Sequence, residues 1–167
     1  MDCLVIGGGP AGLTAAIYLA RFRRNFLVVD AGASRAEWIP VSHNHAGFPE
    51  GVPGAALLKR MRSQAARYGA RIAPGEVKEL VRLPDGSFSA RNGPETITAS
   101  TVLLASGVED IEPKLPNLEN AIRRGFIRHC PICDAYEMID RKVALIGYGK
   151  YCIRECLFLR AYTADLT

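Results

Sequence analysis

The chain opens with short apolar runs that alternate with a segment of helical spacing. Residues 3–6 are apolar and lead into a glycine-rich turn, after which apolar residues recur at helical spacing between positions 13 and 20. A second apolar run at positions 26–29 ends in Asp30. This order predicts a buried strand, a tight turn, a helix and a second buried strand, as in a parallel α/β sheet.

The next segment changes from irregular to helical. Residues 33–54 are rich in Gly, Pro and His and show little periodicity, which indicates a functional loop. Apolar residues between positions 57 and 68 then follow helical spacing up to Gly69. We expect a crossover helix that delivers another strand beginning near Arg71.

Short alternating segments at positions 76–99 surround the turn signals Pro-Asp-Gly and Asn-Gly-Pro, so a small antiparallel meander is expected. Residues 101–105 predict a buried strand that returns to the parallel sheet, with Ser106 and Gly107 bending the chain away. Prolines punctuate residues 109–117, which we interpret as a short, stiff linker.

The last segment repeats the opening pattern. Residues 142–146 predict a strand that runs into a second glycine turn, and apolar residues up to Tyr162 indicate a following helix. Cys152 takes the third glycine position of this turn, and the bulky Lys150 and Tyr151 precede it. The sequence ends where another strand is expected, so the second nucleotide fold looks truncated.

The predicted fold class is therefore α/β. Residues 1–113 form a Rossmann-like unit with a parallel sheet and a small antiparallel meander. Residues 114–167 hold a dithiol segment and the beginning of a second Rossmann-like unit.

Composition narrows the possible functions. With 167 residues and 49% hydrophobic content, the chain can build a core, and its net charge of +4 comes from scattered basic residues. We expect no nucleic-acid partner. No apolar run approaches the roughly 20 residues that span a bilayer, and no charged leader precedes the first strand, so a cytoplasmic protein without membrane contact is expected.

The first glycine turn has the spacing of a dinucleotide site. Gly7, Gly9 and Gly12 fit Gly-x-Gly-x-x-Gly, in which the glycines permit the turn, the approach of a pyrophosphate and close helix packing. Asp30 lies about 20 residues further on, where an acid accepts hydrogen bonds from ribose hydroxyls. The alternative is a glycine turn that serves packing alone.

Cys130 and Cys133 have Cys-x-x-Cys spacing, beside the cationic neighbours Arg128 and His129. Such a pair can carry two electrons as a disulfide. Asp134 could exchange protons with a thiol, or it could simply cap the next turn.

Three further features could be assigned chemistry, but each has an ordinary structural explanation. A zinc site competes for the Cys-x-x-Cys pair, but structural zinc needs four ligands. His43 and His45 could bind a metal, although two histidines without a third ligand are more often ordinary loop residues. Cys152, Cys156 and Cys3 are interpreted as small packing residues.

Together, the motifs resemble those of low-molecular-weight thioredoxin reductases and their thioredoxin-reductase-like relatives, over essentially the whole chain. The resemblance rests on Gly-Gly-Gly-Pro-Ala-Gly with Asp30, residues 44–49, Ala105-Ser106-Gly107, Cys130-Pro131-Ile132-Cys133-Asp134 and the second glycine turn.

The resemblance implies a flavin disulfide reductase with FAD on the first unit and NADPH on the second. Electrons would pass from NADPH through FAD to the Cys130–Cys133 disulfide and on to thioredoxin or a similar disulfide substrate. Cys133 would face the flavin, Cys130 would meet the substrate and Asp134 would be the proton donor. The intact protein would be a homodimer.

The same resemblance implies cofactor-binding residues and no metal. The FAD pyrophosphate and ribose would lie at Gly7, Gly9, Pro10, Ala11, Gly12 and Asp30, the adenine at Val77, the flavin near Asn44, Ala105, Ser106 and Gly107, and NADPH at Gly147 and Gly149.

The chain also departs from the family pattern. Asp30 replaces the usual Glu, Ser106 replaces Thr, and Cys-Pro-Ile-Cys differs from the usual redox motif. The family's arginines for the NADPH 2′-phosphate and its closing carboxyl-terminal segment correspond to positions beyond Thr167. Two alternatives therefore stay open: a related dithiol oxidase acting on a small molecule, or an inactive FAD-binding or apo fragment.

Overall fold

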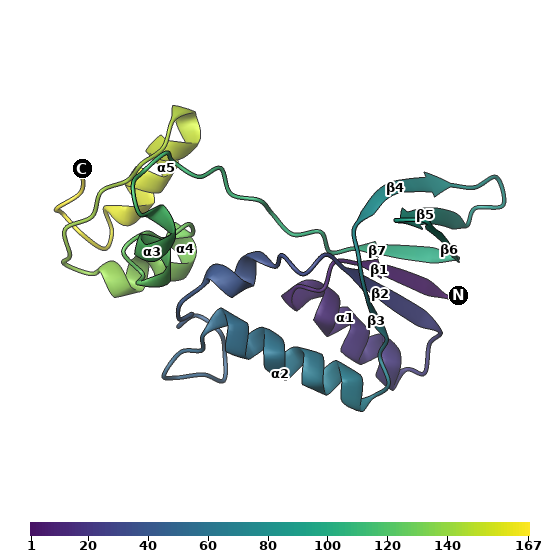
Figure 1. The fold of residues 1–167 in the computed structure, drawn as a ribbon. Helices are drawn as coiled ribbons and strands as arrows, with labels where there is room; N and C mark the ends of the chain where they lie inside the picture. The colour runs from purple at the N-terminus through teal and green to yellow at the C-terminus, as the bar shows by residue number, and fades with distance from the viewer. The chain divides into compact units, whose positions relative to one another are not determined.

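The computed structural model describes all 167 residues and divides into two compact units (Figure 1). The first unit comprises residues 1–38 and 54–109, and the second comprises residues 39–53 and 110–167. The loop at 39–53 thus belongs with the dithiol segment by its contacts. A functional division at residue 113 stays a prediction.

A parallel sheet of four strands, in the order β3-β2-β1-β7, forms the centre of the first unit. Each strand pairs in parallel with its neighbour, as the sequence predicts. The sheet and its helices consist of β1 (Cys3–Ile6), α1 (Pro10–Arg21), β2 (Phe26–Asp30), the 3-10 turn η1 (Arg35–Trp38), α2 (Gly54–Arg67), β3 (Ile72–Pro74) and β7 (Thr101–Leu104).

Alternation along β1 and β2 builds two apolar layers, because successive side chains of a strand point to opposite faces. Val5 and Val28 face α1 and α2, whereas Leu4 and Val29 face the antiparallel sheet. The helix-side cluster contains Cys3, Val5, Ala16, Ile17, Phe26, Val28 and Ala65. The opposite cluster contains Leu4, Val29, Ala90, Ile97 and Ala99. Helices, parallel sheet and antiparallel sheet therefore form three layers.

The antiparallel meander is confirmed. It consists of β4 (Val77–Arg82), β5 (Phe88–Asn92) and β6 (Glu95–Ala99), which pair in that order. Asp85 accepts hydrogen bonds from the hydroxyl and the N–H of Ser87 in the first turn, and these bonds lower the pKa of its carboxyl group. The turn residues therefore fix the register that the alternating strands require.

The expectation that the last strand is buried is wrong. β7 returns to the parallel sheet, as predicted, but it is an edge strand that pairs with β1, and its Leu104 is 67% exposed. An apolar run records how well a segment suits a strand. It does not record whether a further layer covers that strand.

The second unit is mainly helical, with α3 (Leu118–Arg123), α4 (Pro131–Asp134), the 3-10 turn η2 (Ala135–Met138) and α5 (Gly149–Leu159). Sequence reasoning missed α3 and extended the last helix to Tyr162, which lies beyond α5. The strand predicted at 142–146 is absent as an element. Val143 instead forms one isolated parallel bridge to Leu166, because a single short segment is the only partner it meets.

Replacing Val28 with Ala tests the helix-side layer. Val28 is fully buried, so the loss of two methyl groups should lower the free energy of unfolding by about 2–3 kcal/mol. Val81→Ala, on the exposed strand β4, is the matched control and should change it by less than about 0.5 kcal/mol. Urea unfolding followed by circular dichroism measures both, and equal losses would contradict this layer assignment.

Candidate nucleotide and dithiol sites

Backbone contacts bring the carboxyl ends of three strands together at the first glycine turn. Gly7 donates its N–H to the Val29 carbonyl at 2.8 Å, and Ala105 donates to the Ile6 carbonyl at 2.8 Å. Gly7 has φ +108°, and a Cβ there would overlap the carbonyl of Ala105. The turn thus requires glycine, and it places Ala105 beside the predicted pyrophosphate site.

The start of α1 presses against this turn. A Cβ on Gly12 would overlap the Gly7 carbonyl oxygen, so helix and strand approach more closely than any side chain allows. Gly9 is the N-cap residue, Pro10 takes the first helical position, and no side chain caps the first turn. The N–H groups of this turn, including that of Ala11, are therefore available to an anion.

Asp30 is fixed at the end of β2 by three donors. Its Oδ1 accepts from the N–H groups of Gly8 at 3.3 Å and Gly32 at 3.0 Å, and its Oδ2 accepts from Arg62 at 3.1 Å. Arg62 also approaches Glu37 at 3.6 Å. The acid thus faces the glycine turn, as a ribose-binding acid must.

Two further predicted cofactor positions lie in the same unit. The Asp30 carbonyl accepts the Gly75 N–H at 3.0 Å, and Val77 begins β4 two residues later. Ser106 and Gly107 follow β7, where Gly107 has φ +75°. The carboxyl ends of the parallel strands, where nucleotides bind in open α/β sheets, therefore hold the predicted FAD residues of this unit.

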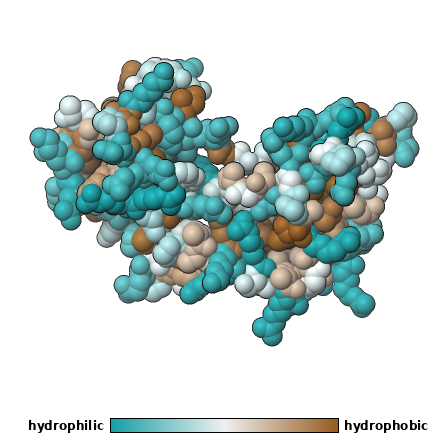
Figure 2. Space-filling view, viewed as in Figure 1, coloured by the Kyte–Doolittle hydropathy of each residue, from teal (hydrophilic) through white to brown (hydrophobic).

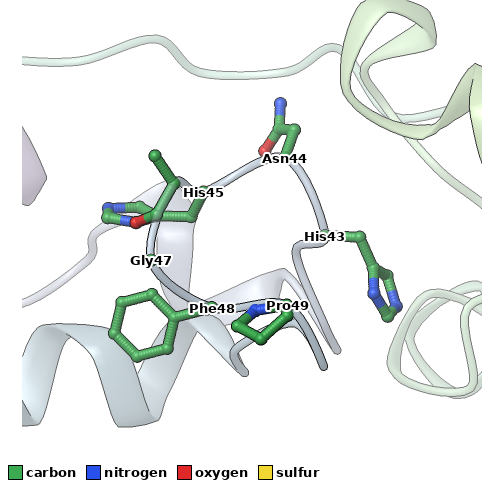
Figure 3. Close-up of a pocket in the computed structure, with 7 residues that line it drawn as sticks. His43, Asn44, His45, Gly47, Phe48 and Pro49 are labelled. Carbon is green, nitrogen blue, oxygen red and sulfur yellow. The ribbon is translucent and has the colours of Figure 1, made fainter.

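Asn44 lies on the loop of the second unit and lines a cavity of about 280 Å³ formed by residues 43–49 (Figure 3). Ser42 donates its hydroxyl to the Asn44 side-chain oxygen at 2.8 Å. His45 packs edge-on against Phe48 on one side of the loop, whereas His43 points away on the other side. The two histidines thus do not converge on one point, and no group of three or more His, Cys, Asp or Glu side chains is placed to hold a metal.

Cys130 and Cys133 form a disulfide with a Cα–Cα distance of 5.2 Å. Cys130 is the N-cap residue of α4, and its Sγ accepts the N–H of Cys133 at 3.2 Å. Its carbonyl accepts the N–H groups of Cys133 and Asp134 at 3.0 and 3.1 Å. A backbone donor is therefore already aimed at the sulfur that would carry negative charge after reduction.

An ion pair and a histidine–carboxylate contact flank the disulfide. Arg128 donates to Asp134 at 3.1 Å, and His129 lies 2.9 Å from Glu112. The Asp134 side chain makes no capping hydrogen bond to the following turn. The capping alternative for Asp134 is therefore not supported.

The second glycine turn starts α5. Gly149, at φ +72°, is the first helical residue, and Tyr148 before it is exposed. A Cβ on Gly147 would lie 3.1 Å from the Cys152 sulfur, so Cys152 occupies the position that Gly12 has in the first turn. Lys150 stacks over the ring of Tyr151.

The other cysteines are free thiols. Cys3 is buried in β1, as expected, and Cys152 and Cys156, interpreted as packing residues on one helix face, are half-buried. One turn of α5 separates them, and that face of the helix is incompletely covered. Partial burial, then the neighbouring Cys156 and the charge of Glu155, raises the pKa of Cys152.

No helix is long and apolar enough to cross a membrane.

Hydrophilic side chains are spread over the visible face of both units, with apolar side chains between them (Figure 2).

Comparison with known proteins decides the family. The sequence profile described as pyridine nucleotide-disulphide oxidoreductase matches residues 1–167. The chain belongs to this family. The fold and the cysteine pair agree with that assignment, since parallel and antiparallel sheets adjoin the glycine turn and the two sulfurs are bonded.

Several relatives are named thioredoxin reductases. That of Streptomyces coelicolor is 32% identical over 170 residues, covering 99% of this chain and 52% of the relative. The bifunctional thioredoxin reductase/thioredoxin of Mycobacterium leprae is 32% identical over 169 residues, covering 99% of this chain and 36% of the relative. The crystal structure of HlmI matches with a TM-score of 0.87 at 30% identity, covering 99% of this chain and 53% of that one. The chain thus spans about half the length of most of these relatives.

Sequence reasoning missed the charged partners in both sites. Arg62 reaches Asp30 from 32 positions away, and nothing in the local pattern indicates that contact. Glu112 pairs with His129 across 17 positions. The sequence indicated Arg128 as a cation near the dithiol. Its pairing with Asp134 depends on how the chain turns between the two residues, which the sequence does not show.

Replacing Gly12 with Ala tests the helix-to-turn contact. In an ordinary helix interior this change stabilises by about 1 kcal/mol. Here the added methyl group overlaps the Gly7 carbonyl, so we expect a loss of about 1–3 kcal/mol in unfolding free energy. Thr14→Ala, exposed on the same helix, is the control, and a stabilised Gly12 variant would show that the contact is absent.

Cys152 should react slowly with iodoacetamide near neutral pH, because the thiolate is the nucleophile and the raised pKa moves thiolate formation to higher pH. Replacing Cys156 with Ala removes part of the cause, so the rate profile of Cys152 should shift to lower pH. Glu155→Gln should shift it less in the same direction. Peptide mass spectrometry resolves the modified cysteine, and an unchanged profile in the Cys156 variant would refute this explanation.

Proposed function

We propose that this chain provides the FAD-binding and dithiol-bearing part of a flavin disulfide reductase. Electrons would pass from NADPH through FAD to the Cys130–Cys133 disulfide, and from the dithiol to a thioredoxin-like protein or a small disulfide. The observation that carries this proposal is that one chain holds both a close-packed Gly-x-Gly-x-x-Gly turn and a bonded Cys-x-x-Cys pair.

The residues of the first unit suit FAD. The glycine turn leaves a helix start that no side chain caps, which suits a pyrophosphate at Gly7, Gly9, Pro10, Ala11 and Gly12. Asp30 and Val77 lie where ribose and adenine would follow, and residues 105–107 close the strand ends. Bound FAD would supply two-electron chemistry that no side chain of this chain offers.

The dithiol would carry out thiol–disulfide exchange. We assign substrate attack to Cys130, because its sulfur accepts the Cys133 N–H and this hydrogen bond favours the thiolate. Cys133 would accept electrons from the flavin side, and Asp134 would exchange protons with the dithiol. Asn44 would lie near the flavin.

The second turn is proposed to bind NADPH. Gly147 and Gly149 lie at the uncapped start of α5, which offers N–H donors to a pyrophosphate as α1 does. We further propose a homodimeric intact protein in a reducing compartment such as the cytoplasm, where the free Cys3, Cys152 and Cys156 would stay reduced.

The test is a visible absorbance spectrum of the purified chain with added FAD, followed by NADPH without oxygen. A bound flavin spectrum that bleaches supports both nucleotide sites. Bound flavin that does not bleach supports an FAD-binding fragment alone, and no bound flavin contradicts the proposal for this chain. Oxidation of a small dithiol with oxygen consumption would instead favour a dithiol oxidase.

Replacing Asp30 with Ala sharpens this test. Loss of a charged acceptor for ribose hydroxyls costs about 1.5–3 kcal/mol, so the FAD dissociation constant should rise at least about tenfold. Asp85→Ala, in an exposed turn of the same unit, should leave it unchanged. Flavin fluorescence titration measures both constants, and equal affinity in the two variants would argue against the ribose role.

A further inference from the structure

Arg128 is held rigidly in the second unit. Its Nε donates to the Gly125 carbonyl at 3.0 Å, and its Nη1 donates to the Val41 carbonyl at 3.4 Å and to Asp134 Oδ1 at 3.1 Å. A Cβ on Gly125 would lie 2.8 Å from Nη2, so the guanidinium packs directly over that glycine. Since backbone carbonyls fix the arginine, Arg128 orients the Asp134 carboxylate.

Asp134 belongs to the same short turn as the dithiol. It follows Cys133 directly, and its N–H donates to the Cys130 carbonyl, so it shares the turn that contains both sulfurs. The Arg128 and Asp134 side chains are 25% and 17% exposed, which limits competition from water for their contact.

We propose that Arg128 is a positioning residue that holds Asp134 as the proton acceptor for Cys133 when a mixed disulfide is resolved. The inference rests on the thiol–disulfide exchange of the proposed function. It adds Arg128 as the residue that speeds the second step of that exchange, in which Cys133 resolves the mixed disulfide.

The exchange has two balanced steps. The Cys130 thiolate attacks one sulfur of the substrate disulfide, which forms a mixed disulfide and releases one substrate thiolate. The Cys133 thiol then gives its proton to Asp134, and its sulfur attacks Cys130 Sγ to release the second thiolate. Two electrons leave the cysteines and reduce the substrate, and the proton passes from Asp134 to solvent.

Other titratable and charged groups lie near this turn, and the carboxylates and the histidine among them are competing proton acceptors. The His129–Glu112 pair precedes Cys130, and Glu137 on η2 has its Oε2 buried without a hydrogen-bond partner. The helix α5, which packs against α4, carries Lys150, Arg154 and Glu155.

The experiment uses the reduced chain, without FAD or NADPH, and an aromatic disulfide, dithiobis-nitrobenzoate, that releases a coloured thiolate in each step. Stopped-flow absorbance separates the two releases. Asp134→Asn and Arg128→Gln should each slow the second release about a hundredfold and leave the first unchanged. In both variants the second release should rise with pH as free thiolate increases, because the fixed base is lost.

Further variants separate positioning from charge. Arg128→Lys keeps the charge but lacks the planar fork, so it should be as slow as Arg128→Gln. The double variant Arg128→Gln with Asp134→Asn should be no slower than Asp134→Asn alone. Arg123→Gln, which removes the exposed pair with Glu119 on α3, is the matched control and should react like the parent chain.

Several outcomes would overturn the inference. A parental rate in Arg128→Lys would show that charge alone matters, and further slowing in the double variant would show that Arg128 acts independently of Asp134. Slowing in Glu137→Gln but not in Asp134→Asn would make Glu137 the acceptor. If Arg128→Gln loses its near-ultraviolet circular dichroism, Arg128→Lys and Asp134→Asn carry the test. Because no flavin is present, failure of the FAD and NADPH proposal leaves this result interpretable.

Discussion

A backbone contact without side chains determines the shape of the first glycine turn, where the first nucleotide site is proposed. Gly12 at the start of α1 meets the carbonyl of Gly7, and Gly7 in turn meets the carbonyl of Ala105. Any side chain at either glycine would push apart the helix, the end of β1 and the segment after β7. The uncapped N–H groups and the carboxylate of Asp30 face one another only because this approach is so close.

The dithiol is fixed in another way. Its helix α4 has four residues, too few for a helix to be stable by itself, so side-chain contacts must supply the order. Arg128 provides them by joining the loop carbonyl of Val41, the turn at Gly125 and the carboxylate of Asp134. A glycine turn built from backbone contacts and a dithiol turn bordered by an arginine network thus occur in one chain.

This difference explains what could be predicted from the sequence. Apolar runs and glycine spacing are local signals, and they correctly predicted the parallel sheet, the meander and the order of motifs. The exposed edge of β7 and the single bridge at Val143 depend on which segments lie alongside, which periodicity does not record. The partners of Asp30 and His129 are distant in sequence, so only the fold shows them.

The two glycine turns show how the residue at the third motif position changes the contact between helix and turn. In the first turn, the third position is Gly12, and the helix lies directly on the turn carbonyl. In the second turn, the third position is Cys152, whose sulfur lies between α5 and Gly147. The Cys152 side chain, rather than bare backbone, thus fills the contact between helix and turn, and partial burial raises the pKa of its thiol. The third position thus decides whether helix and turn meet backbone to backbone or through a side chain.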